Sequence, residues 1–340
     1  MPIEVATEIC VFDQEQFHAL DRRVMPIIFQ VRNEFGRLLN ERLFKVEIAN
    51  RCAENHVLPV QREVCIRVTH DGFAKCYSMD ILISRGFMVE AKTAESIVPA
   101  HRNQSLNYLF LTGLHHARLV NLRSDPVQHE FVSTRLTPER RRQFVVIDAE
   151  WIEPNPESAW LKEKVVEILQ DWGAFLDVAL YREAITWLLG GESLVCQPVG
   201  IFSGSRTVGT QTVDLLTNDT AFSFTSVVRC PEFMRSHQMR FLQHTALNHL
   251  QWVNFNRHQI EFVTLSKAHR RSPCFDDFVL HDFVSPAPCS SEQPDTRQIR
   301  PDGGDKIIED KIRPEQTIVS PCFNDFVLHD FVSPAPCSSE

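Results

Sequence analysis

The sequence predicts a protein of mixed α/β class, in which helices pack on a sheet. Residues 13–55 carry apolar side chains at helical spacing, and residues 97–114 do so again. Short strand-like runs occupy residues 57–68, 77–93 and 117–123. The order of helix, three strands, helix and strand is typical of a unit of roughly 110 residues built on one sheet.

The first helical region is predicted to pack through one apolar stripe. Its run FGRLLNERLFKVEIANRC places apolar residues on one face of a helix. The stripe consists of Leu38, Leu39, Leu43, Phe44, Ile48 and Ala49.

The run YSMDILISRGFMVEAKT predicts two strands joined by a tight turn at residues 84–86. Asp80 then lies in the first strand and Glu90 in the second. Because side chains alternate along a strand, Glu90 and Lys92 share a face, and the hairpin can bring Asp80 beside them. Buried charges are costly unless a partner or a cation compensates them. The run therefore indicates a functional site.

Two converging carboxylates suit a hard divalent cation, Mg²⁺ or Mn²⁺. Asp80 and Glu90 would bind it, and Lys92 would orient a water or neutralise charge on a phosphorane-like transition state. Glu41 on the first helix is a further candidate ligand, and Gln104 on the second could position substrate or water. The alternative is an exposed hairpin whose acids form a weak surface ion pair with the lysine.

The bulk composition does not favour a nucleic-acid-binding protein, because the formal net charge of the 340 residues is −9. A local basic groove would still be compatible with this charge, although such arginines are more often solvated surface residues. The candidate nucleic-acid contacts are Arg62, Arg67, Arg85, His101, Arg102, Tyr108 and the ERRR run at 139–142.

Targeting features are missing from the sequence as given. It has no apolar run of about 18 residues, and its first residues do not read as a signal peptide. The ten cysteines are scattered through apolar segments without a CxxC pair, which favours reduced thiols over a disulfide or zinc framework. We therefore expect a cytoplasmic protein without a membrane partner.

Residues 135–271 read as a diverged second copy of the first domain. Similar helical, strand-like and apolar runs recur there in the same order. Asp214, Phe224 and Ser226 are predicted to replace the acid-acid-lysine cluster, so the same chemistry is not expected. This copy would pad, cap or dimerise with the first domain, or bind substrate through the run at 235–249.

Residues 272–340 are predicted to form a flexible tail with a repeated segment. Residues 272–292 recur at 320–340 with a single change, Asp276 against Asn324. The polar sequence between them is typical of disorder. The repeat is either a docking motif presented twice to an unknown protein partner or a functionless extension.

From about residue 15 to 134 the sequence resembles the GxxExxY family, a branch of the PD-(D/E)XK nuclease superfamily. Three features carry the resemblance: the helix with Gly36, Glu41 and Phe44, the acid-acid-lysine hairpin, and the helix HRNQSLNYLFLTG followed by LVNL. The resemblance implies a restriction-endonuclease-like αβββαβ core. It also implies Asp80, Glu90 and Lys92 as active-site residues, with Gln104 and Glu41 in auxiliary roles.

The sequence departs from the family pattern at the name-giving motif. Gly36 and Glu41 are five residues apart rather than three, and Phe44 stands where the family has tyrosine. Met79 replaces the proline that precedes the first aspartate. These departures affect the first helix more than the acid-acid-lysine cluster.

Together these observations predict a nuclease domain at 1–134, a degenerate copy at 135–271 and the tail. The expected activity is Mg²⁺- or Mn²⁺-dependent hydrolysis of nucleic-acid phosphodiesters, with DNA favoured over RNA and a homodimer left open. The alternative is a catalytically silent binding or scaffold protein. Convergence of the Asp80 and Glu90 carboxylates would favour the enzyme.

Overall fold

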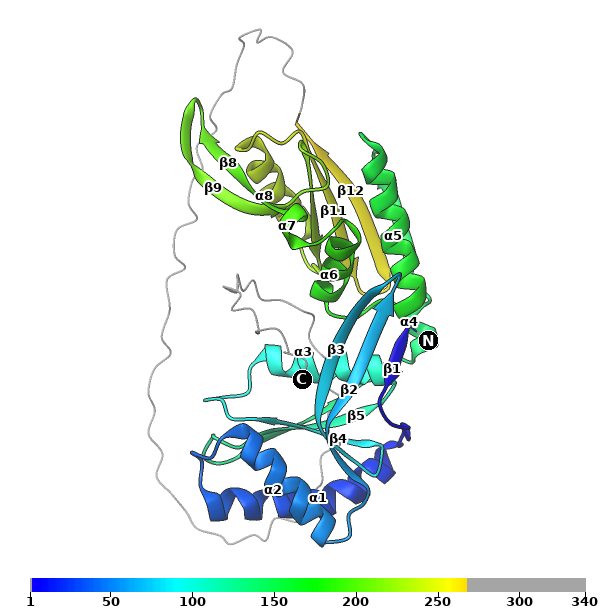
Figure 1. The fold of residues 1–340 in the computed structure, drawn as a ribbon, viewed down its shortest axis with the longest axis vertical. Helices are drawn as coiled ribbons and strands as arrows, with labels where there is room; N and C mark the ends of the chain where they lie inside the picture. Colours follow the sequence, from blue (N-terminus) through cyan, green and yellow to red (C-terminus); the bar gives the residue numbers. More distant parts are fainter. Residues whose placement is uncertain (1, 268–340) are drawn as a thin grey trace, which may run out of the picture. The chain divides into compact units, whose positions relative to one another are not determined.

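The computed structural model describes residues 2–267. It confirms the predicted mixed α/β class, with helices packed against sheets (Figure 1). The tail repeats at 272–292 and 320–340 lie outside the described residues. No helix within residues 2–267 is long and apolar enough to span a bilayer.

The first half contains one six-stranded sheet. In spatial order its strands are β1 (Ile3–Val5), β2 (Val60–His70), β3 (Phe73–Ile83), β4 (Phe87–Lys92), β5 (His116–Asn121) and β6 (Gln128–Ser133). Neighbouring strands are antiparallel except β4 and β5, which are parallel and are connected by helix α3 (Pro99–Thr112). The predicted order of helix, three strands, helix and strand is therefore present.

The first helical region is two helices rather than one. Helix α1 (Gln14–Phe35) ends at Gly36, whose φ of 71° lies in the left-handed region, and α2 (Glu41–Glu54) begins after the N-cap Asn40. The predicted single stripe is consequently wrong in part. Leu38, between the helices, is 81% exposed, and Leu43 is 51% exposed.

The β3–β4 turn is the tight hairpin that the sequence predicts. Ser84 and Arg85 adopt φ values of 51° and 62°, which match the right-handed twist of the two strands. Gly86 is required by close packing, because a Cβ atom there would lie 2.3 Å from the carbonyl oxygen of Cys10. The turn thereby aligns the strands that carry the two acids.

The second half contains a four-stranded and a two-stranded sheet. Its strands are β7 (Val145–Glu150), β8 (Cys196–Ser203), β9 (Arg206–Asp214), β10 (Thr220–Thr225), β11 (His249–Asn256) and β12 (Gln259–Ser266). Its helices are α4 (Pro138–Arg141), α5 (Pro156–Trp172), α6 (Val178–Leu188), α7 (Glu192–Val195) and α8 (Pro231–Gln243). Strands β10 and β11 are parallel and β11 and β12 antiparallel, the same sequence of pairings as β4, β5 and β6.

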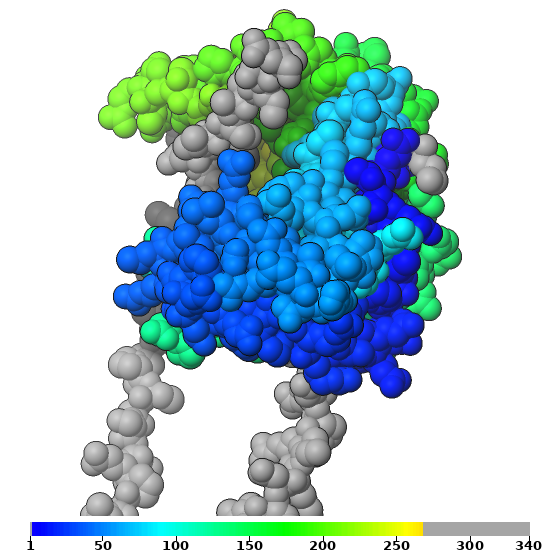
Figure 2. Space-filling view, turned by 60° about the horizontal axis from the view of Figure 1, so that its bottom comes forward, coloured from blue at the N-terminus to red at the C-terminus, as the bar shows by residue number. Residues whose placement is uncertain are grey.

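One apolar core contains residues of both halves. Buried side chains of β2, β3 and α3 belong to the same cluster as those of α5 and α6. The Trp172 indole donates to the Thr69 carbonyl at 2.9 Å, and Lys75 pairs with Glu183 at 2.6 Å. In the space-filling view the light-blue residues of the β2–β3 hairpin lie against green residues of the second half (Figure 2).

The buried Arg141 connects the ends of two helices. Its guanidinium donates to the Phe110 carbonyl in the last turn of α3, and to the Trp172 and Ala174 carbonyls at the end of α5. Carbonyls at helix C-termini have no partner within the helix, and a cation there is favourable. Arg141 therefore caps one helix from each half.

A second core packs α1 and α2 on the other face of the first sheet. Phe17, Ile28, Phe44 and Ile48 are fully buried there against the strands. The strand members of this core include Ile81, Val89 and Ala91. Asp80 and Glu90 are next to these residues in sequence. Because side chains alternate along a strand, the two acids do not point into this core.

His116 is expected to make the fold sensitive to acid. Burial, followed by the charges of His115 and His18, lowers its pKa to about 4, and the imidazole stacks on Phe131 with ring centroids 5.1 Å apart. In the unfolded chain His116 has the ordinary histidine pKa of about 6.5. The stabilisation from burying the neutral imidazole is therefore fully present above pH 6.5 and is lost as the pH falls toward 4.

Urea unfolding of the wild type and of His116→Phe at pH 7.5 and 4.5 would measure this contribution. The wild type should lose more of its free energy of unfolding between the two values than the variant. Equal losses would contradict the role of His116. His258→Phe, at an ordinary turn histidine, is the matched control.

Candidate active site

The strand register brings Asp80 and Glu90 together. Ile81 faces Val89 in the antiparallel β3–β4 ladder, so the next residues, Asp80 and Glu90, follow on facing strands. The ladder stops there, and the Ala91 amide donates to Asp80 Oδ2 at 2.9 Å. Asp80 is 6% and Glu90 1% exposed. The strands thus open around two buried carboxylates.

Glu90 is held by Lys92 on the same face of β4. Lys92 Nζ donates to Glu90 Oε1 at 2.7 Å, while the buried Oε2 has no hydrogen-bond partner among the described residues. Burial and the charge of Asp80 raise the pKa of Glu90 to about 8, against the effect of Lys92. The site therefore holds a buried carboxyl oxygen that no protein donor among the described residues satisfies.

Lys92 remains a cation at neutral pH. Burial would lower its pKa, but the carboxylates of Glu90, Asp80 and Glu41 outweigh burial and raise it. A protonated lysine donates hydrogen bonds and carries charge, and it is a poor base. The predicted role in orienting a water or offsetting negative charge matches this protonation state.

Sequence reasoning missed Lys45 of α2. Lys45 Nζ donates to Asp80 Oδ1 at 2.9 Å and pairs with Glu63 Oε1 at 2.5 Å. The sequence signal was its position one helical turn after Glu41, which puts both on one face of the helix. Lys45 therefore compensates one acid of the site and Lys92 the other.

Glu63 was also missed, and it lies at an irregularity in β2. The β2–β3 register pairs Arg62 with Ile81 and Val64 with Met79, and it omits Glu63. The φ of Glu63 is 50°, a conformation that costs a non-glycine residue about 1–3 kcal/mol. Such strain is concentrated at functional sites.

Glu41 lies beside the strand end that carries Lys92. It is the first residue of α2, and its Oε2 accepts from the Thr93 amide at 3.1 Å. The Glu41 charge also contributes to raising the pKa of Glu90. The structure therefore brings Glu41 into the neighbourhood of the acid pair.

Helix α3 brings Gln104 and Tyr108 to the same region. Gln104 Nε2 donates to the Tyr108 hydroxyl at 2.9 Å. Burial raises the pKa of Tyr108 to about 12, and the charges of Glu90 and Asp80 add to this effect. Tyr108 was predicted to contact nucleic acid, but it is only 6% exposed. Its hydroxyl instead holds the Gln104 side chain in place.

The predicted basic contacts are not gathered at the acid pair. Arg85 lies in the turn at the opposite end of β4 and pairs with Glu8 at 2.5 Å. Arg102 makes a bidentate pair with Glu130. Arg141 of the ERRR run is 2% exposed and bonded to backbone carbonyls, so a phosphate contact there is wrong.

His101 lies close enough to Lys92 and Glu41 for their charges to affect its pKa. Burial lowers its pKa, and Lys92 lowers it further while Glu41 opposes this shift. Its Nδ1 accepts from the Val98 amide at 3.3 Å, at the beginning of α3. His101 is therefore close to the lysine, and its surroundings disfavour the protonated imidazole.

The donor set fits a hard divalent cation. Asp80 and Glu90 supply carboxylate oxygens, and the unpartnered Glu90 Oε2 provides an acceptor that no protein donor uses among residues 2–267. No cluster of three or more metal-ligating side chains occurs in this part of the chain. A two-carboxylate site with water and substrate oxygens is typical of Mg²⁺.

Comparison with known proteins agrees with this geometry. Residues 18–133 match the family model of the PD-(D/E)XK nuclease superfamily. No curated protein and no solved structure matches the chain. The matched segment extends from α1 to the end of β6 and contains every candidate residue of the acid site.

Proposed function

We propose that the first half, whose residues 18–133 match the family model of the PD-(D/E)XK nuclease superfamily, hydrolyses phosphodiester bonds of nucleic acid with a divalent metal. The observation that carries the proposal is the pair of buried acids with an unpartnered Glu90 oxygen. DNA is the preferred polymer in this proposal, and RNA is the second.

The proposed roles of the site residues follow from their charges. Asp80 and Glu90 would hold Mg²⁺ or Mn²⁺, with Glu41 as an additional ligand through water. When bound, the cation supplies electrophilic polarisation of the phosphate and a more acidic water. Lys92, which stays protonated, would donate to that water or to a phosphate oxygen, and Gln104 would position either group.

The test is cleavage of a labelled pool of single- and double-stranded DNA and RNA in EDTA, Mg²⁺ or Mn²⁺. The wild type should cleave only with metal, and the Asp80→Ala/Glu90→Ala double variant should not cleave. Calorimetric titration of each metal into both proteins would report binding separately. Absence of metal binding and cleavage in the wild type would favour a catalytically silent binding protein.

Lys45 is expected to couple fold stability to the metal. Replacing it with methionine leaves Asp80 buried without a cation, which should lower the free energy of unfolding in EDTA by roughly 3 kcal/mol. Saturating Mn²⁺ should restore most of this loss, because the cation replaces the lost charge. Thermal melts in EDTA and Mn²⁺ measure both effects.

Lys162→Met is the matched control, since Lys162 pairs with Asp148 at the surface. Its melting temperature should change little in either condition. If Mn²⁺ stabilised Lys45→Met no more than the wild type, metal binding at Asp80 would be excluded.

A further inference from the structure

The two acids of the candidate active site differ in the oxygens that they leave free. Glu90 Oε2 is buried and has no hydrogen-bond partner among the described residues. Both oxygens of Asp80 are in use, because Oδ2 accepts from the Ala91 amide and Oδ1 from Lys45 Nζ, each at 2.9 Å. Glu90 therefore offers a metal a free oxygen, whereas Asp80 offers only oxygens that protein donors already use.

Lys45 is the donor that can leave Asp80. The Ala91 amide belongs to the backbone of β4 and is fixed by the strand. Lys45 reaches the acid from helix α2 through a flexible stem of four carbons. Two cations beside one buried carboxylate repel each other strongly, because the protein interior screens charge poorly. Lys45 should therefore release Asp80 when a divalent cation binds there.

Glu63 gives the released ammonium a second carboxylate. Lys45 Nζ already lies 2.5 Å from Glu63 Oε1, so it can release Asp80 and remain paired. The side chain of Glu63 is 51% exposed, whereas those of Lys45 and Asp80 are 12% and 9% exposed. The lysine would thus stay compensated by the more exposed of its two acids.

Two features of the β2–β3 hairpin hold Glu63 beside the lysine. The register of the two strands omits Glu63, whose φ of 50° lies in a region that non-glycine residues rarely adopt. Its Oε2 also accepts from the Ser78 hydroxyl at 2.8 Å. A solvated surface glutamate needs neither feature, and both direct this carboxylate to Lys45.

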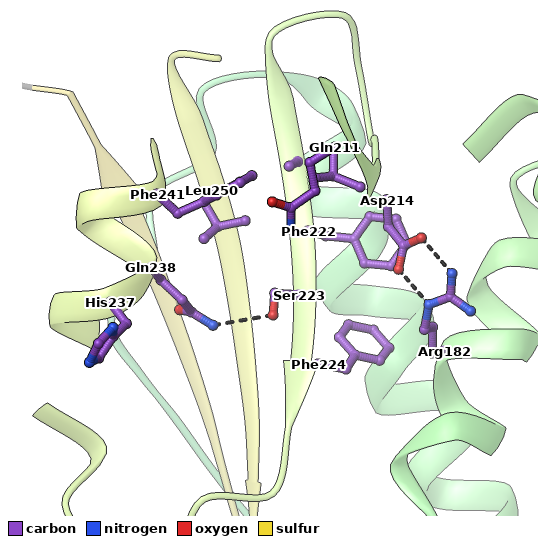
Figure 3. A pocket seen from close by; sticks show the side chains of 12 residues that line it. Arg182, Gln211, Asp214, Phe222, Ser223, Phe224, His237, Gln238, Phe241 and Leu250 are labelled. Atoms are coloured by element: carbon purple, nitrogen blue, oxygen red, sulfur yellow. Dashed lines mark hydrogen bonds and ion pairs between the residues drawn. The ribbon is translucent and has the colours of Figure 1, made fainter. Parts of the chain in front are cut away.

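An aspartate of the second half shows the opposite arrangement. Arg182 of α6 donates from Nε and Nη2 to the two oxygens of Asp214, at 2.5 and 2.6 Å (Figure 3). The planar guanidinium holds both oxygens at once, and a bidentate contact of this kind is strong and rigid. Asp214 thus has a fixed cation, whereas Lys45 holds one oxygen of Asp80 and shares its charge with Glu63.

We propose that Lys45 occupies Asp80 in the metal-free protein, gives up this contact when a divalent cation binds, and keeps its contact with Glu63. The inference rests on the proposed function for the metal site. Glu63 is then a positioning residue, which acts on metal binding through Lys45 and does not touch the metal. The competition at Asp80 sets the metal concentration at which the site fills, and so regulates the activity.

The test is calorimetric titration of Mn²⁺ and Mg²⁺ into the full chain as wild type, Lys45→Met, Glu63→Gln and the double variant. Lys45→Met should bind Mn²⁺ about tenfold more tightly, because no ammonium competes for Asp80. Glu63→Gln should bind it about fivefold more weakly, because Lys45 loses its alternative partner. The double variant should match Lys45→Met, since Glu63 acts only through the lysine.

A lysine–glutamate pair outside the site provides matched controls. Lys164 and Glu167 of α5 are paired at 2.6 Å. Lys164→Met and Glu167→Gln should bind both metals with wild-type affinity. Adding Asp80→Ala to Lys45→Met should remove the gain in affinity, because the competition is for this acid.

Glu63→Gln tests the proposal even if Lys45→Met fails to fold. The exposed Glu63 side chain can be changed without leaving a buried charge unpaired, because Lys45 keeps its contact with Asp80. Weaker metal binding by this variant supports the proposal, and unchanged or tighter binding overturns it.

Two further results would overturn the proposal. The first is unchanged or weaker metal binding by Lys45→Met. The second is an equal loss of affinity from Glu63→Gln with and without Lys45, which would make Glu63 a ligand or a long-range charge.

The proposed function is tested separately by the same titrations and by cleavage assays. If the wild type binds metal and cleaves nucleic acid while any of these contrary results is found, only the role of Lys45 and Glu63 is rejected. Affinities in the expected order without cleavage reject only the catalytic proposal. Absence of metal binding in every protein rejects both, whereas binding by Lys45→Met alone supports the competition.

Discussion

Replacing Glu90 with glutamine is expected to lower the rate of metal-dependent cleavage by about a thousandfold. The amide keeps the size of the side chain but removes one of two metal-binding charges. Lys92 also loses the carboxylate that now holds it at 2.7 Å. Single-turnover cleavage of a labelled substrate at saturating Mn²⁺ measures the loss.

The fold should tolerate this change. Burial and the charge of Asp80 raise the pKa of Glu90 to about 8, so ionising this carboxyl at neutral pH is already costly. A neutral amide of the same shape should therefore give an equal or higher melting temperature in EDTA. Glu34→Gln, at an exposed position of α1, is the control and should cleave at the wild-type rate. Undiminished cleavage by Glu90→Gln would remove Glu90 from the catalytic site.

Among the substitutions discussed, replacing Arg141 with methionine is expected to lower the free energy of unfolding most. Three carbonyls of two helix ends, at residues 110, 172 and 174, would lose their donor. Burying the guanidinium is itself costly, and it lowers the pKa of Arg141 to about 10. Three unsatisfied buried acceptors outweigh that relief, because each costs about 1–3 kcal/mol.

We therefore expect the free energy of unfolding to fall by about 3 kcal/mol or more, which is a drop of roughly 6–12 °C in melting temperature for a unit of this size. Calorimetry gives both values. Arg140→Met, at the exposed neighbour, should leave both unchanged. A melting temperature within 2 °C of the wild type would mean that water replaces the guanidinium.

The hairpin and its acid-acid-lysine arrangement could be predicted because they depend on local rules. Residues 84–86 specify the turn, and the alternation of side chains places Glu90 and Lys92 together. The 2.7 Å bond between their side chains confirms that they share a face. Helix α3 was equally predictable, since it begins with Pro99 and ends before Gly113.

Residues whose environment depends on distant segments could not be predicted. Lys45 reaches Asp80 only because α2 packs beside the place where the strands open, and Glu63 joins it through an irregularity in β2. Arg141, in the ERRR run, was predicted as a candidate phosphate contact. Arg141 is buried because the ends of α3 and α5 lie next to each other around it, a tertiary contact that no local sequence pattern predicts.

The core shared by the two halves limits which deletions the protein can tolerate. Deleting residues 135–267 would leave the apolar side chains of β2, β3 and α3 without cover, and would remove the cap on α3, the helix that carries Gln104. A truncated chain would therefore be a substrate for chaperones and proteases and not a smaller nuclease. The second half is therefore needed for the stability of the first, independently of any function of its own.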